Sequence, residues 1–382
     1  MDDSHDVKAR PNEAAVALFS RTQGRRTFED WVMQTDMHYY GTYAMARAAG
    51  IKPEFAIAAA TAAQYVDDSD RFTVTLSDGN VIKSEPTAHH TSDRANVDLE
   101  DQRRTWVPFH FIPGGEGRTP GERLLCTKDS TIAQEMVKHH ISLAREEYGV
   151  LLIGIAAHAY ADTFAHYGFS GMSSELNKVD TDSFDLQVNN QDLRNDLKNG
   201  ADRFWNKYVG KAINLVMLGH GSVATYPDRP YLRWSFNYAD GNRKSGLRDN
   251  PVTFLAACHK LHQMFIDFGK QVPGYFIDAA AVRSFDAIRQ AVAAVLTVEA
   301  ELEGRIAAWQ EAAVSGTVFN NPERAPIPGY DPGTFTRDMG LLATFDLPRA
   351  SRTLIYQFVR AADVHRQYML ETLLPKNSIV LT

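Results

Sequence analysis

Cysteine is scarce in this sequence, which has two cysteines in 382 residues. They are Cys126 and Cys258, and they form no CxxC pair. A disulfide scaffold and a zinc site built from cysteine thiolates are therefore both excluded. We expect two free thiols that act as small apolar residues in the core.

Long apolar runs are also missing. No segment approaches the roughly 20 consecutive apolar residues that a membrane-spanning helix needs. Residues 1–31 are charged and lack the basic start, apolar centre and small-residue cleavage site of a secretory leader. On these grounds we expect a cytoplasmic protein without a transmembrane segment.

Lysine and arginine never form a long basic run, and the net charge is −7 with an isoelectric point near 6.0. Binding to the phosphates of nucleic acid needs clustered basic side chains. A stable nucleic-acid partner is therefore not expected. The hydrophobic content of 44% is ordinary for a globular chain, and at this length it is enough for a large core.

Helical periodicity dominates what is present. We expect a polar arm over 1–26, a metal-binding helical core over 27–250, and C-terminal helices over 251–382 that pack on the core rather than form an independent domain. The expected helices cover 37–49, 53–70, 131–169 as two helices, 200–221, 251–271, 284–314 and 350–374, and a loop or short helix is expected over 174–200. The amphipathic C-terminal helices also offer a surface for a homo-oligomer.

One segment has the alternation of a β-hairpin. Phe72, Val74 and Leu76 alternate with polar residues, and Asp78 and Gly79 supply a tight turn. We expect a small β-hairpin insertion near 71–112. The predicted fold class is therefore mainly α: a multi-helix bundle with a hairpin insertion and extra C-terminal helices.

Three strongly polar residues, His158, Asp162 and His166, interrupt the otherwise apolar helical stretch GIAAHAYADTFAHYGFSG. Residues four apart in a helix lie on one stripe, here about 12 Å long. Buried aspartate and histidine are costly unless they are paired or bind a metal. We interpret the stripe as part of a site for more than one metal ion. The alternative is a hydrogen-bonded His–Asp–His cluster that fixes the packing of the core.

Other residues with the chemistry of metal ligands lie outside this helix. Carboxylates at a helix C-terminus oppose the helix dipole, and a bound cation would explain them. A histidine in an aromatic segment or between glycines can be a ligand held by rigid surroundings. The plainer interpretation is a helix cap, a solvated helix end, a core histidine or a turn residue. The candidates are Asp36 and His38 at a helix start, Asp67 and Asp68 at a helix end, His110 in an aromatic strand-like segment, and His220 with Asp228 around a turn.

The order of these residues resembles that in the superfamily of bacterial zinc-dependent phospholipases C and fungal single-strand-specific nucleases. The stretch GIAAHAYADTFAHYGFSG is similar to the helix that supplies most ligands there, and it also resembles an uncharacterised bacterial family related to that superfamily. The likeness spans residues 34–235. The order reads His38, Asp67 or Asp68, His110, His158 with Asp162, His166, and then His220 with Asp228.

This resemblance implies an all-helical, metal-dependent hydrolase of phosphoesters, with two or three zinc ions or another divalent metal that activate water. It implies a phosphodiester, phospholipid or nucleotide-like substrate, and a role for Asp67 or Asp68 in positioning the attacking water. In the superfamily the N-terminal amine and carbonyl bind one zinc, a role for which Asp36 is the candidate here. Two spacings depart from the superfamily: His166 follows Asp162 by four residues rather than six, and Asp228 lies eight residues beyond His220 rather than four.

Substrate contacts are expected from two further pairs. His89 and His90 are candidates for the rim of the substrate site, and Arg229 and Arg233 are candidates for binding phosphate. Exposed loop histidines and solvated arginines are the plainer interpretation. The competing hypothesis for the whole chain is a non-catalytic helical interaction protein, in which the same residues hold a structural metal or a buried His–Asp network.

Overall fold

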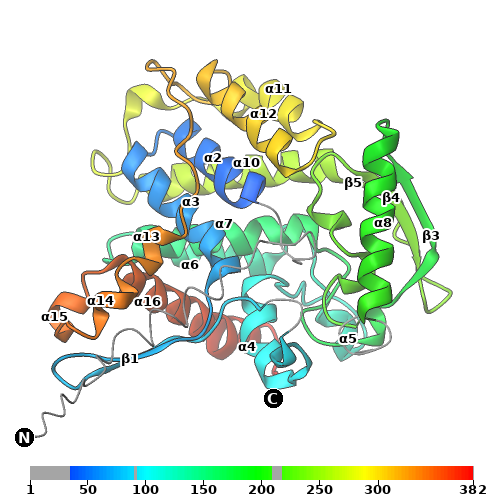
Figure 1. Cartoon of the computed structure of the whole chain (residues 1–382), viewed down its shortest axis with the longest axis horizontal. Coiled ribbons are helices and arrows are strands. Elements are labelled where there is room, and N and C mark those ends of the chain that lie inside the picture. The colour runs from blue at the N-terminus through cyan, green and yellow to red at the C-terminus, as the bar shows by residue number, and fades with distance from the viewer. Residues whose placement is uncertain (1–34, 90–92, 209–216, 382) are drawn as a thin grey trace, which may run out of the picture.

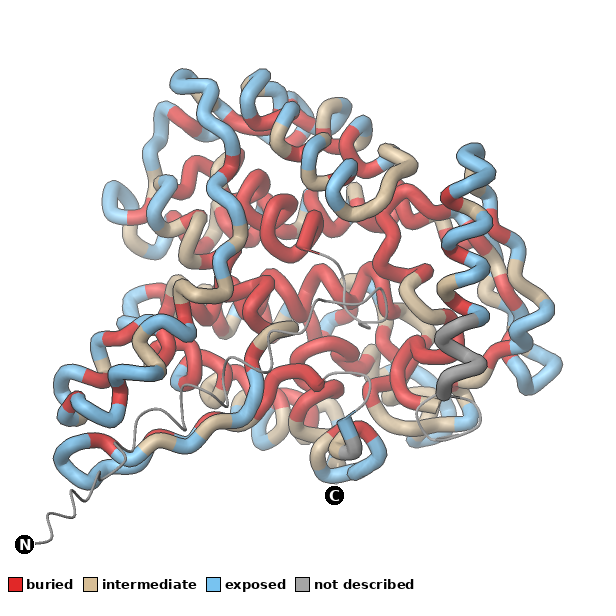
Figure 2. Tube along the Cα trace, viewed as in Figure 1, coloured by how far each residue is buried: buried red, intermediate tan, exposed pale blue. Residues whose placement is uncertain are grey.

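An almost continuous apolar sequence forms helix α7 (Gly149–Ala165), which runs through the middle of the molecule (Figure 1). The helices that pack most extensively against it are α3 (Pro53–Asp68), α6 (Thr131–Ser142), α10 (Asn250–Gly269) and α16 (Leu354–Gln367). The helix is buried along nearly its whole length (Figure 2). A helix enclosed in this way has no solvated face, so its polar side chains lie inside the protein.

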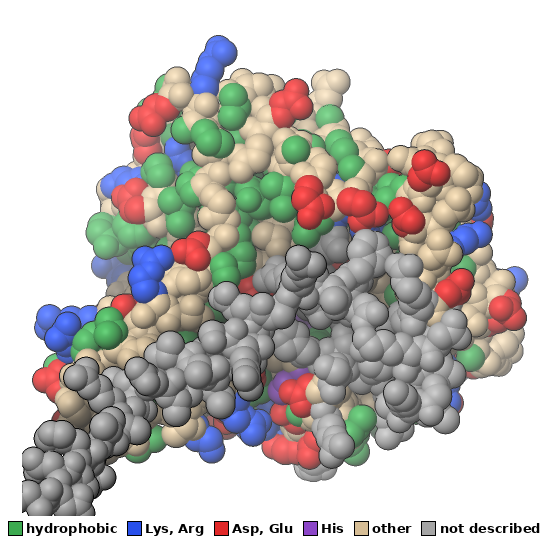
Figure 3. Space-filling view, in the orientation of Figure 1, with side chains coloured by type: hydrophobic (Ala, Val, Ile, Leu, Met, Phe, Trp, Pro, Cys, Tyr) green, Lys and Arg blue, Asp and Glu red, His purple; other side chains and the backbone are tan. Residues whose placement is uncertain are grey.

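This computed structural model describes residues 35–89, 93–208 and 217–381. The expected arm over 1–26 lies outside the described residues. Within them the protein is mainly helical, as predicted, and it has two small antiparallel sheets. No helix among the described residues combines the length and the apolar character that crossing a membrane requires. Lys and Arg side chains are scattered over the face seen in Figure 3 rather than gathered in one patch.

The first described helices follow the predicted boundaries closely. A π-helical turn, η1 (Asp36–Gly41), continues into α2 (Thr42–Ala48), and Gly50 then adopts a φ of 85° that ends the helix. Pro53 opens α3, where its missing N–H costs nothing. The wide turn of η1 was not predicted, and π-turns of this kind are frequent at functional sites.

Helices α3 and α7 pack closely because Gly154 has no side chain. A Cβ atom at Gly154 would lie 2.3 Å from the backbone oxygen of Ala59 and 2.8 Å from the Cβ of Ala62. Both neighbours belong to α3, whose far end carries Asp67. The glycine therefore sets the distance between the two helices.

We expect Gly154→Val to lower the free energy of unfolding by about 1–3 kcal/mol, because the added methyl groups overlap backbone atoms that cannot move aside. Urea denaturation measures the change. Gly340→Ala is the matched control, since a Cβ at Gly340 meets no atom within 4 Å. Equal unfolding midpoints for the two variants would show that α3 and α7 are not in close contact.

The predicted hairpin is confirmed. Strands β1 (Thr73–Thr75) and β2 (Val81–Lys83) pair antiparallel, with Thr75 opposite Val81. Gly79 has a φ of 85° in the turn between them.

The strand-like segment expected before His110 is instead helix α4 (Leu99–Phe109). The side chain of Asp98 caps its first turn by accepting a hydrogen bond from the N–H of Asp101. Pro108 cannot donate to the carbonyl oxygen of Arg104 within the helix, and Arg366 Nε donates to that oxygen at 3.0 Å instead. This long-range contact stabilises a helix that the local sequence does not favour.

A second sheet also differs from expectation, since 174–200 was expected to be a loop or short helix. Strand β3 (Val179–Gln187) pairs with β4 (Arg233–Tyr238), which pairs with β5 (Arg248–Asp249), and α8 (Gln191–Tyr208) follows β3. Leu186 and the aromatic residues Trp234 and Phe236 form a core that anchors the polar strand β3. Of the helix expected over 200–221, residues 200–208 belong to α8, and residues 209–216 lie outside the described part.

The C-terminal third packs on α7 and α2 through α10 and on α7 through α16. The expected helix over 284–314 is two helices, α11 (Phe285–Leu296) and α12 (Leu302–Val314). Thr297 ends α11 by donating its hydroxyl to backbone oxygens of that helix. The remaining elements are short: η2 (Arg94–Val97), α5 (Pro120–Arg123), η3 (Glu175–Asn177), η4 (Gly221–Val223), η5 (Tyr226–Asp228), η6 (Ala279–Ala281), α13 (Gly333–Thr336), α14 (Met339–Leu342), α15 (Leu347–Ala350), η7 (Tyr368–Leu373) and α17 (Leu374–Lys376).

Candidate metal centre

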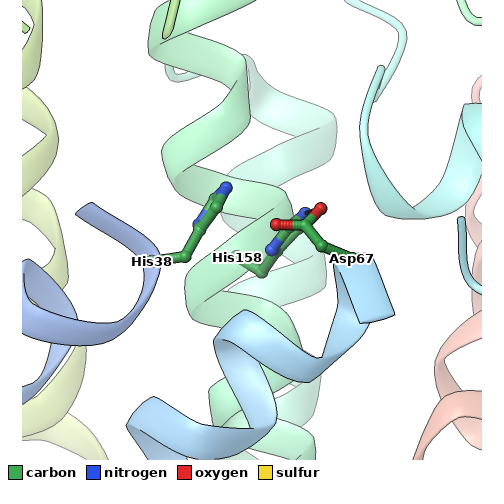
Figure 4. A group of neighbouring side chains, drawn as sticks. All are labelled: His38, Asp67 and His158. Atoms are coloured by element: carbon green, nitrogen blue, oxygen red, sulfur yellow. Dashed lines mark ion pairs between the residues drawn. The ribbon is translucent and has the colours of Figure 1, made fainter. Parts of the chain in front are cut away.

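Five buried side chains from four elements meet beside α7, and we call them the first cluster. His38 comes from η1, Asp67 from the end of α3, His110 from the residue after α4, and His158 and Asp162 from α7. These side chains are at most 4% exposed. Three of them, from three separate elements, lie beside one another in Figure 4. The fold therefore brings together ligand-type residues that are far apart in the sequence.

Asp162 lies at the centre of the first cluster. Its Oδ2 atom is 3.2 Å from His110 Nδ1 and 3.3 Å from His158 Nε2, and its Oδ1 atom is 3.2 Å from His38 Nε2. Neither His38 Nε2 nor Asp162 Oδ1 has a hydrogen-bond partner among the described residues, despite their short separation. The two atoms are close together, but their geometry is not that of a hydrogen bond. Ligands of a shared cation are arranged in this way.

Backbone carbonyl oxygens fix the protonation of two histidines in this cluster. His158 Nδ1 is 2.8 Å from the oxygen of Ala63, and His110 Nε2 is 2.8 Å from the oxygen of Thr87. A carbonyl oxygen only accepts, so each of these nitrogens donates its hydrogen to the backbone. The other nitrogens, His158 Nε2 and His110 Nδ1, then face each other 3.1 Å apart. Two ring nitrogens turned toward one point are arranged as the ligands of one metal ion are.

The second cluster consists of His166, His220 and Asp228, all buried. His166 Nε2 lies 3.1 Å from Asp228 Oδ1, and His220 Nε2 lies 3.8 Å from Asp228 Oδ2. The Nδ1 atom of each histidine donates to a backbone oxygen, that of His110 at 2.9 Å and that of Ala224 at 2.9 Å. The Nε2 atom of each histidine therefore faces Asp228, in the orientation that the ring nitrogens of metal-binding histidines adopt.

The two clusters are adjacent. Asp162 Oδ2 of the first cluster is 3.6 Å from His166 Nδ1 of the second. The stripe predicted from the sequence therefore contributes to both clusters. His158 and Asp162 lie on α7, and His166 is the residue that caps its C-terminal end. His166 groups with His220 and Asp228, although His166 follows Asp162 by only four residues and Asp228 follows His220 by eight.

Burial and neighbouring charges shift the pKa values of these residues strongly. Burial lowers the pKa of His158 to about 3 and that of His220 to about 4, so both rings are neutral at pH 7. Burial opposes the charged form of His166, but the carboxylates of Asp162 and Asp228 raise its pKa to about 9. Burial also opposes ionisation of Asp162, yet the facing histidines hold its pKa well below the ordinary value. Neutral histidines and ionised aspartates are the forms that bind metals.

Two predicted ligands lie outside both clusters. Asp36 is buried and accepts a hydrogen bond at 2.7 Å from Arg305 Nε, because the buried guanidinium needs a counter-charge. Asp68 accepts a hydrogen bond from the hydroxyl of Tyr330. The structure thus separates Asp67, which joins the first cluster, from its neighbour Asp68, a choice that the sequence left open.

The predicted substrate contacts are also paired within the protein. His89 lies between two carboxylates, 2.5 Å from Asp101 and 3.3 Å from Asp93. Arg229 is buried rather than solvated, whereas Arg233 is half-exposed on β4 and pairs with Asp249 at 2.9 Å. His90 lies outside the described residues.

Sequence reasoning missed the backbone oxygens that orient the histidines and the buried Arg305. Carbonyl groups have no sequence signature, so Ala63, Thr87 and Ala224 could not have been selected. Arg305 lies in the C-terminal third, 269 residues from its partner Asp36. The available signal was the position of Arg305 in an amphipathic helix, on the face that carries the buried residues of α12.

Comparison with known proteins gives one match. No curated protein and no solved structure matches this chain. Residues 33–373 match the model of a family of unknown function, DUF6765. That span includes both clusters and every described helix that packs around α7. The chain therefore belongs to the DUF6765 family.

Proposed function

We propose that this protein is a metal-dependent hydrolase of phosphoesters, with one zinc or similar divalent ion in each cluster. The observation that carries the proposal is the inward-facing set of histidine ring nitrogens, each oriented by a backbone oxygen on the opposite side of the ring. Oriented histidines beside buried carboxylates are the donor set that zinc prefers. The order of these residues along the chain, which resembles the zinc-dependent phospholipase C superfamily, supports the same proposal.

The charges of the two clusters fit this chemistry. The first cluster holds two carboxylates and the second holds one, while burial keeps His158 and His220 neutral. Two divalent cations together with three carboxylates would give the two clusters a net charge of +1. A centre with that balance favours an anionic substrate such as a phosphoester.

Bound divalent ions supply Lewis-acid chemistry and lower the pKa of a water molecule toward neutrality. The protein's own residues would orient that chemistry. Asp162 lies between the clusters, and Asp67 Oδ1, 3.6 Å from His158 Nε2, is placed at the edge of the first cluster to accept a proton from water. Asp68, which was the alternative for this role, is held by Tyr330 instead.

Deep burial favours a second candidate, a structural metal centre in an interaction protein. The side chains of the clusters are at most 4% exposed, and structural sites are closed whereas catalytic sites keep an open position. The two candidates share the same ligands. They differ in whether the metal-loaded protein turns over a substrate.

Turnover of bis(4-nitrophenyl) phosphate by the zinc-loaded chain tests the proposal. We expect activity that disappears on chelation, returns with zinc, and falls at least about a hundredfold in His38→Ala, which removes a nitrogen that has no other partner. His262→Asn is the control, because His262 is buried and bonded to the oxygen of Arg283 away from both clusters. A zinc-loaded protein that hydrolyses neither this diester nor 4-nitrophenyl phosphate would favour the structural centre.

A further inference from the structure

Arg248 is a buried arginine that belongs to neither cluster. It is 1% exposed, and it lies on strand β5 of the second sheet. Among the described residues it forms no ion pair with a carboxylate. Arginine is almost never fully buried unless it is paired, so the position of this side chain needs an explanation.

Two backbone oxygens at the end of α7 hold the guanidinium group of Arg248. Its Nη1 atom donates to the oxygen of Tyr167 at 2.8 Å, and its Nη2 atom donates to the oxygen of Ala165 at 2.6 Å. Carbonyl groups at a helix C-terminus carry partial negative charge, which favours a cation there. The two residues flank His166, the C-terminal cap of α7 and a member of the second cluster. One planar group therefore bridges the backbone on both sides of a candidate metal ligand.

Aromatic rings fix the guanidinium group of Arg248 in place. Its Cζ atom lies 3.6 Å from the centre of the Tyr167 ring, 5.1 Å from that of Trp234 and 5.7 Å from that of Phe169. A guanidinium group stacks on aromatic faces in this way. Trp234 is also the residue of β4 that pairs with Arg248 in the sheet. The register of the second sheet therefore delivers Arg248 to the end of α7.

A second side chain of the same sheet holds the turn that follows His166. The hydroxyl of Tyr238 donates to the oxygen of Gly168 at 3.2 Å. Gly168 has a φ of 87°, and a Cβ atom there would lie 2.5 Å from that hydroxyl oxygen. The chain therefore turns sharply after His166 against side chains that β4 and β5 supply.

These contacts complement those that orient the imidazole ring of His166. Its Nδ1 atom donates to the oxygen of His110 at 2.9 Å, and the ring of Phe111 stacks on it with the ring centres 4.7 Å apart. Both contacts act on the ring, whereas Arg248 and Tyr238 act on the backbone that carries it. A metal ligand must be held within about 0.5 Å of its productive position, so the two kinds of contact are both needed.

We propose that Arg248 is a positioning residue of the second cluster, whose bridge between two carbonyl groups holds His166 where its Nε2 atom binds zinc beside Asp228. The inference rests on the metal-binding part of the proposed function and does not depend on hydrolysis. Lysine keeps the positive charge of arginine but lacks its planar fork of donors, so it cannot hold both carbonyl groups in the same geometry. Arg248→Lys therefore separates the bridge from the charge.

Zinc affinity of the full chain, measured by competition with a chromophoric chelator, tests this inference at each cluster separately. Combined with His158→Ala, which removes a ligand of the first cluster, Arg248→Lys is expected to weaken zinc binding at the second cluster about tenfold. Combined with His220→Ala, which removes a ligand of the second cluster, it is expected to leave zinc binding at the first cluster unchanged. A merely structural role of Arg248 would lower both affinities.

Two further variants make the result specific. Tyr238→Phe removes a single hydroxyl from the same turn, and it is expected to weaken zinc binding at the second cluster less than Arg248→Lys does. Arg283→Met is the matched control, because Arg283 also donates to two backbone oxygens, those of Gly316 and Thr317, away from both clusters. This control is expected to change neither zinc affinity.

Equal losses at the two clusters, or an unchanged second cluster in Arg248→Lys, would overturn the inference. If Arg248→Lys does not fold, Tyr238→Phe decides alone, and an unchanged second cluster in that variant has the same consequence. A selective loss in a zinc-loaded protein that turns over no phosphoester would retain the positioning role and reject the hydrolase. An active hydrolase whose second cluster ignores both variants would retain the hydrolase and reject the positioning role. A parent chain that binds no zinc would overturn both.

Discussion

Replacing Asp162 by alanine is expected to lower the zinc affinity of the first cluster by about a hundredfold or more. Loss of a residue that only hydrogen-bonds to a metal ligand already lowers metal affinity about 10–100-fold, and Asp162 is proposed as a ligand itself. Asp162 is within 3.3 Å of nitrogens from His38, His110 and His158. Asp67 Oδ1 lies further from two of these histidines, 3.6 Å from His158 Nε2 and 3.9 Å from His110 Nδ1. Equilibrium dialysis against zinc measures the affinity and the number of ions bound.

Two variants make this result specific. Asp162→Asn keeps the shape of the side chain but loses its charge, so we expect a smaller loss of affinity than with alanine. His262→Asn removes a buried histidine that belongs to neither cluster and is expected to bind zinc as the parent chain does. Unchanged affinity and stoichiometry in Asp162→Ala would mean that the His–Asp network is held by hydrogen bonds alone.

Chelation is expected to lower the melting temperature by several degrees. An ion present at a hundred times its dissociation constant stabilises the fold by about 2.7 kcal/mol, and two ions double this amount. Removing them also leaves the Asp162 carboxylate buried beside neutral His158, whose Nε2 lone pair faces it. Calorimetry with and without EDTA, followed by addition of zinc or magnesium, measures the effect.

Zinc should restore the melting temperature and magnesium should not, since magnesium prefers oxygen ligands and both clusters are rich in histidine nitrogen. The double variant His166→Asn and His220→Asn removes the histidines of the second cluster and should halve the shift. A melting temperature that is the same with EDTA and with zinc would contradict two bound ions, whatever the activity of the protein.

The stripe on α7 could be predicted because it is encoded locally. Helical spacing places His158, Asp162 and His166 on one side, and the apolar residues around them require burial. The hairpin and the end of α2 at Gly50 follow from equally local signals, a turn dipeptide and a glycine with positive φ. These features need no knowledge of the rest of the chain.

Other features depend on distant contacts and were missed for that reason. The helix before His110 is stabilised by Arg366, which lies more than 250 residues further along the chain and donates to the oxygen that Pro108 leaves free. Asp36 was predicted as a metal ligand, but Arg305 from α12 neutralises it. Strand β3 has a polar sequence and exists because β4 provides the apolar partners.

In the candidate site, too, local features could be predicted and features that depend on distant contacts could not. Residue type and order correctly indicated which side chains to examine, and eight of the predicted ligands fall into the two clusters, namely His38, Asp67, His110, His158, Asp162, His166, His220 and Asp228. The choice between Asp67 and Asp68 depended on which way a helix end turns, and the hydroxyl of Tyr330 settles the position of Asp68.

Anomalous X-ray scattering at the zinc edge from crystals of the zinc-loaded protein tests the central claim most directly. The proposal predicts one peak within about 2.0–2.2 Å of the inward nitrogens of the first cluster and another at the same distance from those of the second. Histidine rings in direct hydrogen-bond contact with the carboxylates, and no anomalous peak at either cluster, would contradict it.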